Sequence, residues 1–189
     1  MAIRQDCGPC TVLIEATGAT INGMPIQAAD SVARFHSLFG TPTRIDPAGP
    51  PAPAGHRNNY IHFYDHLGVY LNEHHFTYQI QEVGFVLDID EAAHPTERPF
   101  TGQLHVGGIT LSPSATEDTL AESSLSFTSK LRGSWSTEIQ SGLPGISIYV
   151  SIDSNGRRLP SGRRSKVRQL LSVSLGLHHD PWDTTHRPS

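Results

Sequence analysis

Two short segments 85 positions apart in the sequence carry the same hairpin pattern. Residues 20–27 (TINGMPIQ) and 105–112 (HVGGITLS) each place a glycine-containing turn between short stretches with apolar residues. In the first segment, Asn22-Gly23 supplies the positive φ angles that a two-residue hairpin turn requires. The recurrence favours a duplicated unit, and a chance similarity between short β patterns is the alternative.

A helix is expected after each hairpin. Residues 28–40 (AADSVARFHSLFG) predict one, because the large apolar residues fall on one helical face and Gly40 suits the position just after a helix end. Residues 114–126 predict a shorter one, with Ser114 or Thr116 as its N-cap. The two chain halves therefore share the same order of elements.

Three strands are expected after each helix, because β-branched and aromatic residues concentrate there between turn signals. A long proline- and glycine-rich loop, Asp46 to Asn59, precedes the first set. We therefore predict an α+β fold of two tandem strand-helix-three-strand repeats that form antiparallel sheet, with the helices packed on one face. The expected strands lie within residues 60–64, 68–72, 78–89, 134–139, 145–152 and 166–177.

The length of 189 residues fits one ordinary domain or two small units that share a core. A polar stretch interrupted by prolines between the two halves is the expected linker. The predicted divisions are an N-terminal segment 1–10, a first repeat 11–90, a linker 91–100, a second repeat 101–177 and a flexible tail 178–189.

The charge and the apolar content indicate which partners to expect. A formal net charge of -4 argues against nucleic acid, since phosphate binding relies on an excess of Lys and Arg. No apolar run approaches the roughly 20 residues that a membrane-spanning helix needs, so we expect no membrane partner. The first residues lack the charged start and the apolar stretch of a signal peptide, and we therefore expect a cytoplasmic protein.

The sequence Cys7-Gly8-Pro9-Cys10 matches the dithiol motif of thioredoxin-like oxidoreductases. In those proteins the first cysteine follows a strand and begins a helix, whose dipole lowers the pKa of the thiol. Here Cys10 leads directly into the β-branched stretch TVLIE, and no βαβ unit precedes it. We expect a plain segment at a strand edge; a disulfide and, less favoured, a redox dithiol remain open.

Other catalytic patterns are missing from the sequence. Ser134 lacks the flanking glycines of a nucleophile elbow, and neither a phosphate-binding loop nor a dinucleotide glycine pattern occurs. Cys7 and Cys10 have the spacing of half a zinc site, but a second closely spaced pair is missing. We therefore predict no enzyme, no catalytic residue, no cofactor and no metal.

Several motifs resemble an uncharacterised bacterial domain family encoded among toxin and immunity genes of interbacterial competition systems such as type VI secretion. The motifs are NGMPIQ, LFGTPTR, NNYIHFYDHLGVYLN and PFTGQLHVGGITLS, and the resemblance extends from Thr11 to Gly176. More distantly, the chain resembles the modules of outer-membrane assembly lipoproteins and tandem-repeat β-lactamase inhibitor proteins, although it lacks their lipidation and secretion signals. The resemblance implies a binding protein.

Under this resemblance, the protein is expected to be an immunity protein that binds a cognate toxin and occludes its active site. A scaffold or assembly module of a secretion apparatus is the main alternative, a thiol redox protein is a weaker one, and a homodimer stays open. We expect the contacts in the loop Asp46 to Asn59, on exposed strand faces, at the following turn and in an acidic cluster that would orient a basic toxin. The candidate residues are His62, Tyr64, Tyr70, Glu73, His74, His75, Asp88, Asp90 and Glu91. Ordinary core packing of the strand residues and a solvated acidic loop are the alternatives.

Overall fold

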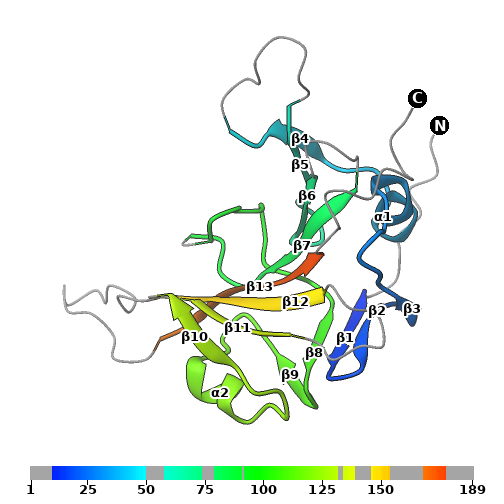
Figure 1. Ribbon diagram of the computed structural model, residues 1–189. Helices are drawn as coiled ribbons and strands as arrows, with labels where there is room; N and C mark the ends of the chain where they lie inside the picture. The colour runs from blue at the N-terminus through cyan, green and yellow to red at the C-terminus, as the bar shows by residue number, and fades with distance from the viewer. Residues whose placement is uncertain are drawn as a thin grey trace, which may run out of the picture.

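The computed structural model describes residues 10–49, 58–73, 79–90, 92–131, 134–138, 146–153 and 168–177. In these residues the chain forms thirteen strands and two short helices, so the molecule is mostly β (Figure 1). The strands form two sheets of five and eight strands. Neither helix in the described part of the chain is long and apolar enough to cross a membrane.

The smaller sheet is built from the two hairpins that the sequence predicts. Its central strand β1 pairs antiparallel with β2 and parallel with β8, so that Val12 lies opposite both Ile21 and Leu104. The strand order is β3-β2-β1-β8-β9. The bounds are β1 Thr11–Glu15, β2 Gly18–Ile21, β3 Met24–Pro25, β8 Gln103–Val106 and β9 Ile109–Leu111.

The larger sheet is antiparallel throughout, and the two chain halves meet at its centre. There β7 pairs with β13, with Val83 opposite Leu175 and Phe85 opposite Val173. The strand order is β10-β11-β12-β13-β7-β6-β5-β4. The bounds are β4 Arg44–Pro47, β5 Tyr60–Tyr64, β6 Val69–Glu73, β7 Ile80–Val86, β10 Thr128–Leu131, β11 Ser134–Glu138, β12 Ile146–Ile152 and β13 Leu170–Leu177.

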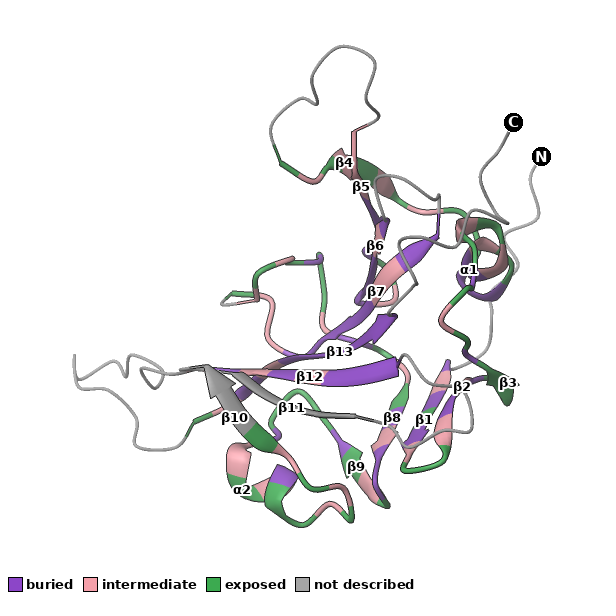
Figure 2. Cartoon of the chain, viewed as in Figure 1, coloured by how far each residue is buried: buried purple, intermediate pink, exposed green. Residues whose placement is uncertain are grey.

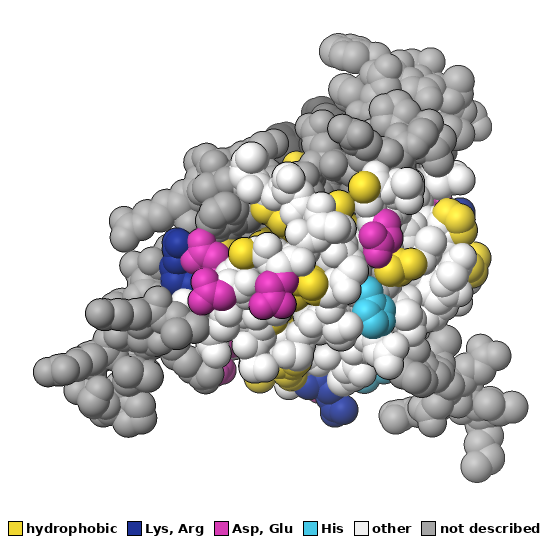
Figure 3. Space-filling model, turned by 90° about the horizontal axis from the view of Figure 1, so that it is seen from below, with side chains coloured by type: hydrophobic (Ala, Val, Ile, Leu, Met, Phe, Trp, Pro, Cys, Tyr) yellow, Lys and Arg dark blue, Asp and Glu magenta, His cyan; other side chains and the backbone are white. Residues whose placement is uncertain are grey.

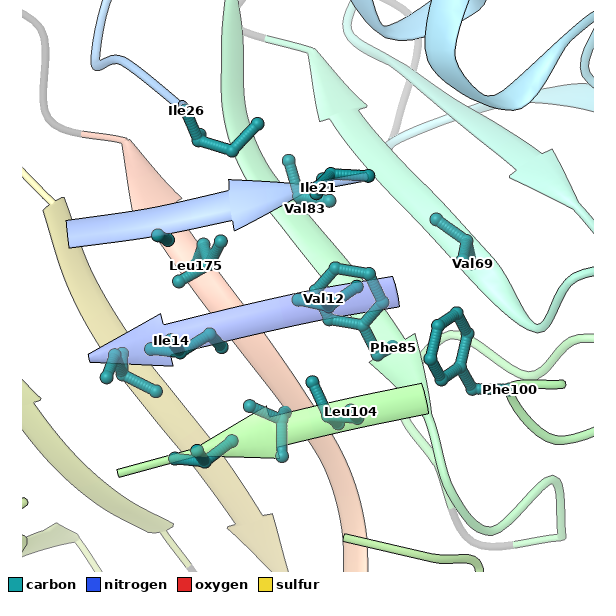
Figure 4. Packing of buried hydrophobic residues seen from close by; sticks show 14 of the residues in the cluster. Val12, Ile14, Ile21, Ile26, Val69, Val83, Phe85, Phe100, Leu104 and Leu175 are labelled. Atoms are coloured by element: carbon teal, nitrogen blue, oxygen red, sulfur yellow. The ribbon is translucent and has the colours of Figure 1, made fainter. Parts of the chain in front are cut away.

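The prediction of an α+β fold with helices packed on one sheet face is wrong. The helices α1 (Val32–Phe39) and α2 (Glu117–Ala121) have only eight and five residues, which is too short to cover a large sheet. The smaller sheet covers the larger one instead, because the inward residues of its strands are apolar. Figure 4 shows Val12, Ile14 and Leu104 pointing from β1 and β8 toward β7 and β13.

One hydrophobic core fills the space between the sheets and reaches under both helices. It joins residues of both chain halves, and its central side chains are fully buried. Figure 2 shows this burial along β1, β7, β12 and β13. The core therefore belongs to the whole chain and not to either half alone.

A second, smaller cluster lies on the opposite face of β5 to β7, where Ile61, Phe63, Tyr70 and Val86 are buried. The segment 92–100, predicted as a linker, is attached to this part of the fold. Thr96 and Phe100 are buried, and Arg44 donates a hydrogen bond to the carbonyl of Pro95 over 2.8 Å. The face of β5 that carries Ile61 and Phe63 is therefore covered.

The two chain halves have local features at corresponding positions. Asn22-Gly23 and Gly107-Gly108, the two turns 85 positions apart, all have positive φ angles, of 52°, 76°, 55° and 82°. The N-cap residues Ser31 and Thr116, also 85 positions apart, each form an isolated β-bridge, to Gln79 and Gln169. A duplicated unit stays a prediction.

Candidate functional site

Four of the predicted contact residues are buried. His62 and Tyr70 expose 6% and 4% of their surface, Glu73 exposes 2% and Tyr64 none. The prediction that His62, Tyr64 and Tyr70 lie on an exposed strand face is wrong, because α1 covers one face of β5 and the second cluster lies on the other. Glu73, predicted to begin a turn, is the last residue of β6. Exposure of these residues to a partner would require the fold to open.

Two residues of the predicted acidic cluster, Asp88 and Asp90, are accessible. Asp90 is exposed and Asp88 is half-buried, and the Asp90 amide donates a hydrogen bond to Asp88 Oδ1 over 3.0 Å in a tight turn after β7. This turn lies at the end of β7 opposite to the end that pairs with Glu73. His74, His75 and Glu91 lie outside the described residues, as does Cys7, whereas Cys10 is described and its thiol is buried.

The structure brings two predicted residues together with one that the sequence reasoning missed. His36 of α1 approaches His62 of β5, with 3.4 Å between His36 Nε2 and His62 Nδ1. His62 Nε2 in turn lies 3.4 Å from Glu73 Oε2 on β6. We call His36, His62 and Glu73 the histidine cluster.

The local sequence explains how these three side chains meet. Ser31 caps α1 by accepting a hydrogen bond from the Arg34 amide, and the helix ends at Gly40, whose φ is 85°. Phe35 and Phe39 anchor the helix in the core, and Phe39 packs against Tyr64 with 5.3 Å between ring centroids. His36 follows Phe35 directly, so it lies at the border of the buried helix face. That position is the signal that could have identified it.

Tyr64 extends the polar group beside the histidine cluster. Its ring lies edge-on to His36, with 6.3 Å between centroids. Its hydroxyl is buried and has no hydrogen-bond partner, and burial raises the pKa of that hydroxyl. Burial lowers the pKa of His36, the charge of His62 lowers this pKa further, and the charge of Glu73 opposes the shift.

The histidine cluster has the chemistry of a proton relay. A neutral His62 that donates from Nε2 to Glu73 is an acceptor at Nδ1 for the His36 Nε2–H. Both separations are at the long limit of hydrogen bonding. Within the described residues, no group of three His, Cys, Asp or Glu side chains is arranged to hold a metal ion. The arrangement thus links α1 to the sheet through a chain of groups that can each hold a proton.

A second feature is the exposed face of β4, the edge strand next to β5. Ile45 lies opposite His62 and Pro47 lies opposite Tyr60, so these four residues share one sheet face. Ile45 is 50% exposed, Pro47 is exposed and Tyr60 is half-buried. We call Ile45, Pro47 and Tyr60 the edge patch. The contact loop predicted from the sequence, Asp46 to Asn59, includes Pro47 but neither Ile45 nor Tyr60.

Residues 11–120 match a family described as a domain of unknown function, DUF7738, over more than half of the chain. The chain belongs to this family. The histidine cluster and the edge patch lie within the DUF7738 match, whereas β10 to β13 lie beyond it. A search of curated proteins and a search of solved structures each found no match. The DUF7738 description assigns no activity, so the resemblance to toxin and immunity loci stays a prediction.

Proposed function

We propose that the protein works by binding another protein, as an immunity protein that covers the active site of a cognate toxin. The observation that carries the proposal is the edge patch. It presents Ile45, a large hydrophobic side chain, on an edge strand that α1 leaves uncovered. Apolar and aromatic side chains at such positions supply much of the binding energy in protein interfaces.

The edge patch also borders the loop that the sequence marks as a contact region. The connection between β4 and β5 begins after Pro47 and ends at Tyr60, so it starts and ends within the patch. Strand β6 ends at Glu73 at this same end of the sheet, because β6 runs antiparallel to β5 and Asn72 pairs with Ile61. The edge patch, the end of β4, the start of β5 and the end of β6 therefore lie at the same end of the larger sheet.

The charge of the molecule favours a basic partner. The formal net charge is -4, and the Asp88–Asp90 turn is accessible. On the face shown in Figure 3, Asp and Glu side chains lie among hydrophobic and uncharged ones, and Lys and Arg lie at the edges. Such a surface speeds encounter with a positively charged toxin more than it adds affinity. We place the complex in the cytoplasm, where a toxin made by the same cell would first act.

Co-expression with the protein encoded next to this one tests the proposal. The neighbour alone should arrest growth, co-expression should relieve the arrest, and the two proteins should co-purify. A harmless neighbour, or relief of arrest without a complex, would contradict occlusion of a toxin. Co-purification with components of a secretion apparatus instead would favour the scaffold function.

The redox alternative is tested separately, with a Cys7→Ser, Cys10→Ser double variant in the same co-expression assay. Because buried thiols react slowly and Cys10 is buried, we expect this variant to relieve growth arrest as well as the unaltered protein does. Loss of the relief in a variant that still folds would favour thiol chemistry.

A further inference from the structure

Helix α1 is attached to the larger sheet in three ways: by apolar packing, by a backbone bridge at its start between Ser31 and Gln79, and by a chain of polar side chains. Phe35, Leu38 and Phe39 supply the packing, and each is buried. The polar chain is the histidine cluster, in which His62 lies between His36 of the helix and Glu73 of the sheet. We propose that the histidine cluster is an acid-sensitive latch, which holds α1 on the sheet at neutral pH and releases it when both histidines are protonated.

The groups that face His36 are few. In the described part of the chain they are His62 and Tyr64 from β5 and Glu73 from β6. The neighbouring β4 contributes Ile45 to this face, which carries no charge. On α1 itself, Arg34 is engaged by Asp30 at 3.0 Å and by the carbonyl of Pro25. One carboxylate therefore faces two histidines.

The protonation states of the two histidines determine whether the contacts in the cluster attract or repel. With both histidines neutral, each contact has one donor and one acceptor, and Glu73 is ionised. A proton on His62 is balanced by Glu73, but it turns His62 Nδ1 into a donor that faces His36. A proton on His36 as well places two positive rings side by side, with ring centroids 5.3 Å apart, while the Glu73 carboxylate lies on the far side of His62. Like charges at such separations in a partly buried site repel strongly.

The pKa of His36 is lowered, which is the direction that an acid-sensitive latch requires. Burial and the charge of His62 hold the pKa of His36 below the ordinary histidine value of 6.5. A group with a lowered pKa in the folded state contributes stability that is present above its ordinary pKa. That stability is lost as the pH falls through the lower pKa of the folded state. Acid therefore weakens the attachment of α1 and does not strengthen it.

The latch does not depend on the proposed function, and hydrogen exchange of the free protein tests it. The protection of the α1 amides, corrected for intrinsic exchange rates and referred to the β13 amides, is measured at about pH 7.5 and about pH 5, which span histidine titration. We expect the protection of α1 to fall about tenfold or more in acid while that of β13 holds. Equal protection of α1 at both pH values would overturn the proposal.

Two variants separate the latch from a general effect of acid. His36→Gln keeps an amide that can donate to His62 but carries no charge, so its α1 protection should not change with pH. His105→Gln is the matched control, because His105 lies on β8 and contacts Thr110 at 2.9 Å, outside the histidine cluster. It should respond like the unaltered protein. A fall in His36→Gln as large as in the unaltered protein would refute the latch.

An NMR titration of the His36 ring in the unaltered protein gives an independent reading if a variant folds poorly. The His36 ring should titrate over the pH range in which α1 loses its protection. If the His36 and His62 rings both gain protons while α1 stays fully protected, the latch is excluded.

Discussion

At the scale of single residues, two buried tyrosines on adjacent strands have opposite surroundings. The Tyr70 hydroxyl donates a hydrogen bond to Glu82 Oε1 over 2.8 Å, and its ring covers Gly84 so closely that an added Cβ would lie 2.1 Å from Tyr70 Cε1. The Tyr64 hydroxyl is buried without a partner. A satisfied and an orphaned buried hydroxyl affect stability differently, because only the orphan has lost its hydrogen bonds to water without replacement.

This difference predicts the outcome of two matched substitutions. Tyr70→Phe should lower the free energy of unfolding by about 1 to 2 kcal/mol, since it removes the hydrogen bond to the half-buried Glu82 carboxylate. Tyr64→Phe should leave the free energy unchanged or raise it by up to about 1 kcal/mol, since it removes an unpartnered group. Urea denaturation of both variants measures the effect. A larger loss for Tyr64→Phe than for Tyr70→Phe would contradict the assignment of partners.

The residue scale also shows why the sequence misplaced several candidates. YIHFY at residues 60–64 has polar or amphipathic residues at alternate positions, which is typical of a strand with one exposed face. In the structure, α1 covers one face and the second cluster lies on the other, so His62 and Tyr64 are buried. The alternation of residue types within one strand does not show whether distant segments of the chain pack on its polar face. Only the contact of His36 with His62 reveals the histidine cluster.

At the scale of elements, the strands after each predicted helix are close to the predicted ranges, and both helices are present. The sequence missed the short edge strands β4 and β10. It also missed the parallel pairing of β1 with β8, which joins residues as distant as Val12 and Leu104. Hairpins are local and carry turn signals, whereas a parallel pair and the stacking of two sheets depend on contacts between distant residues. The layer arrangement was therefore predicted wrongly.

The attachment of β4 depends on Arg44. Its guanidinium lies 3.5 Å from the centroid of the Phe63 ring, pairs with Asp46, and bonds Asp65 Oδ2 over 3.1 Å. Asp65 is 1% exposed and accepts one further hydrogen bond, from the Glu97 amide. Arg44 thus neutralises a buried carboxylate and links β4 to the segment that follows β7.

We therefore expect Arg44→Ala to lower the free energy of unfolding by about 2 kcal/mol or more, because Asp65 is left buried without its cation. Arg168→Ala is the control. Arg168 pairs with Glu117 at 2.6 Å on the surface, and exposed pairs contribute about 1 kcal/mol or less. Chemical denaturation of both variants provides the measurement. Equal losses in the two variants would show that Asp65 does not need Arg44.

At the scale of the whole molecule, the two halves share one core and one central strand pair, and the proposed binding surface lies at one end of the larger sheet. The edge patch and helix α1 both come from the first half, within the DUF7738 match. The second half supplies β13, which supports β7, and β8, which completes the smaller sheet. In this account the second half stabilises the surface that the first half presents.

Calorimetric titration with the neighbouring gene's product tests most directly whether the edge patch binds the partner. Ile45 and Met24 are 50% and 44% exposed and lie on edge strands of different sheets, so they form a matched pair. Ile45→Asp should weaken binding by about 2 kcal/mol or more, roughly thirtyfold, as loss of a central interface side chain does. Met24→Asp should bind like the unaltered protein. Equal affinity of both variants, or a loss only for Met24→Asp, would contradict the account.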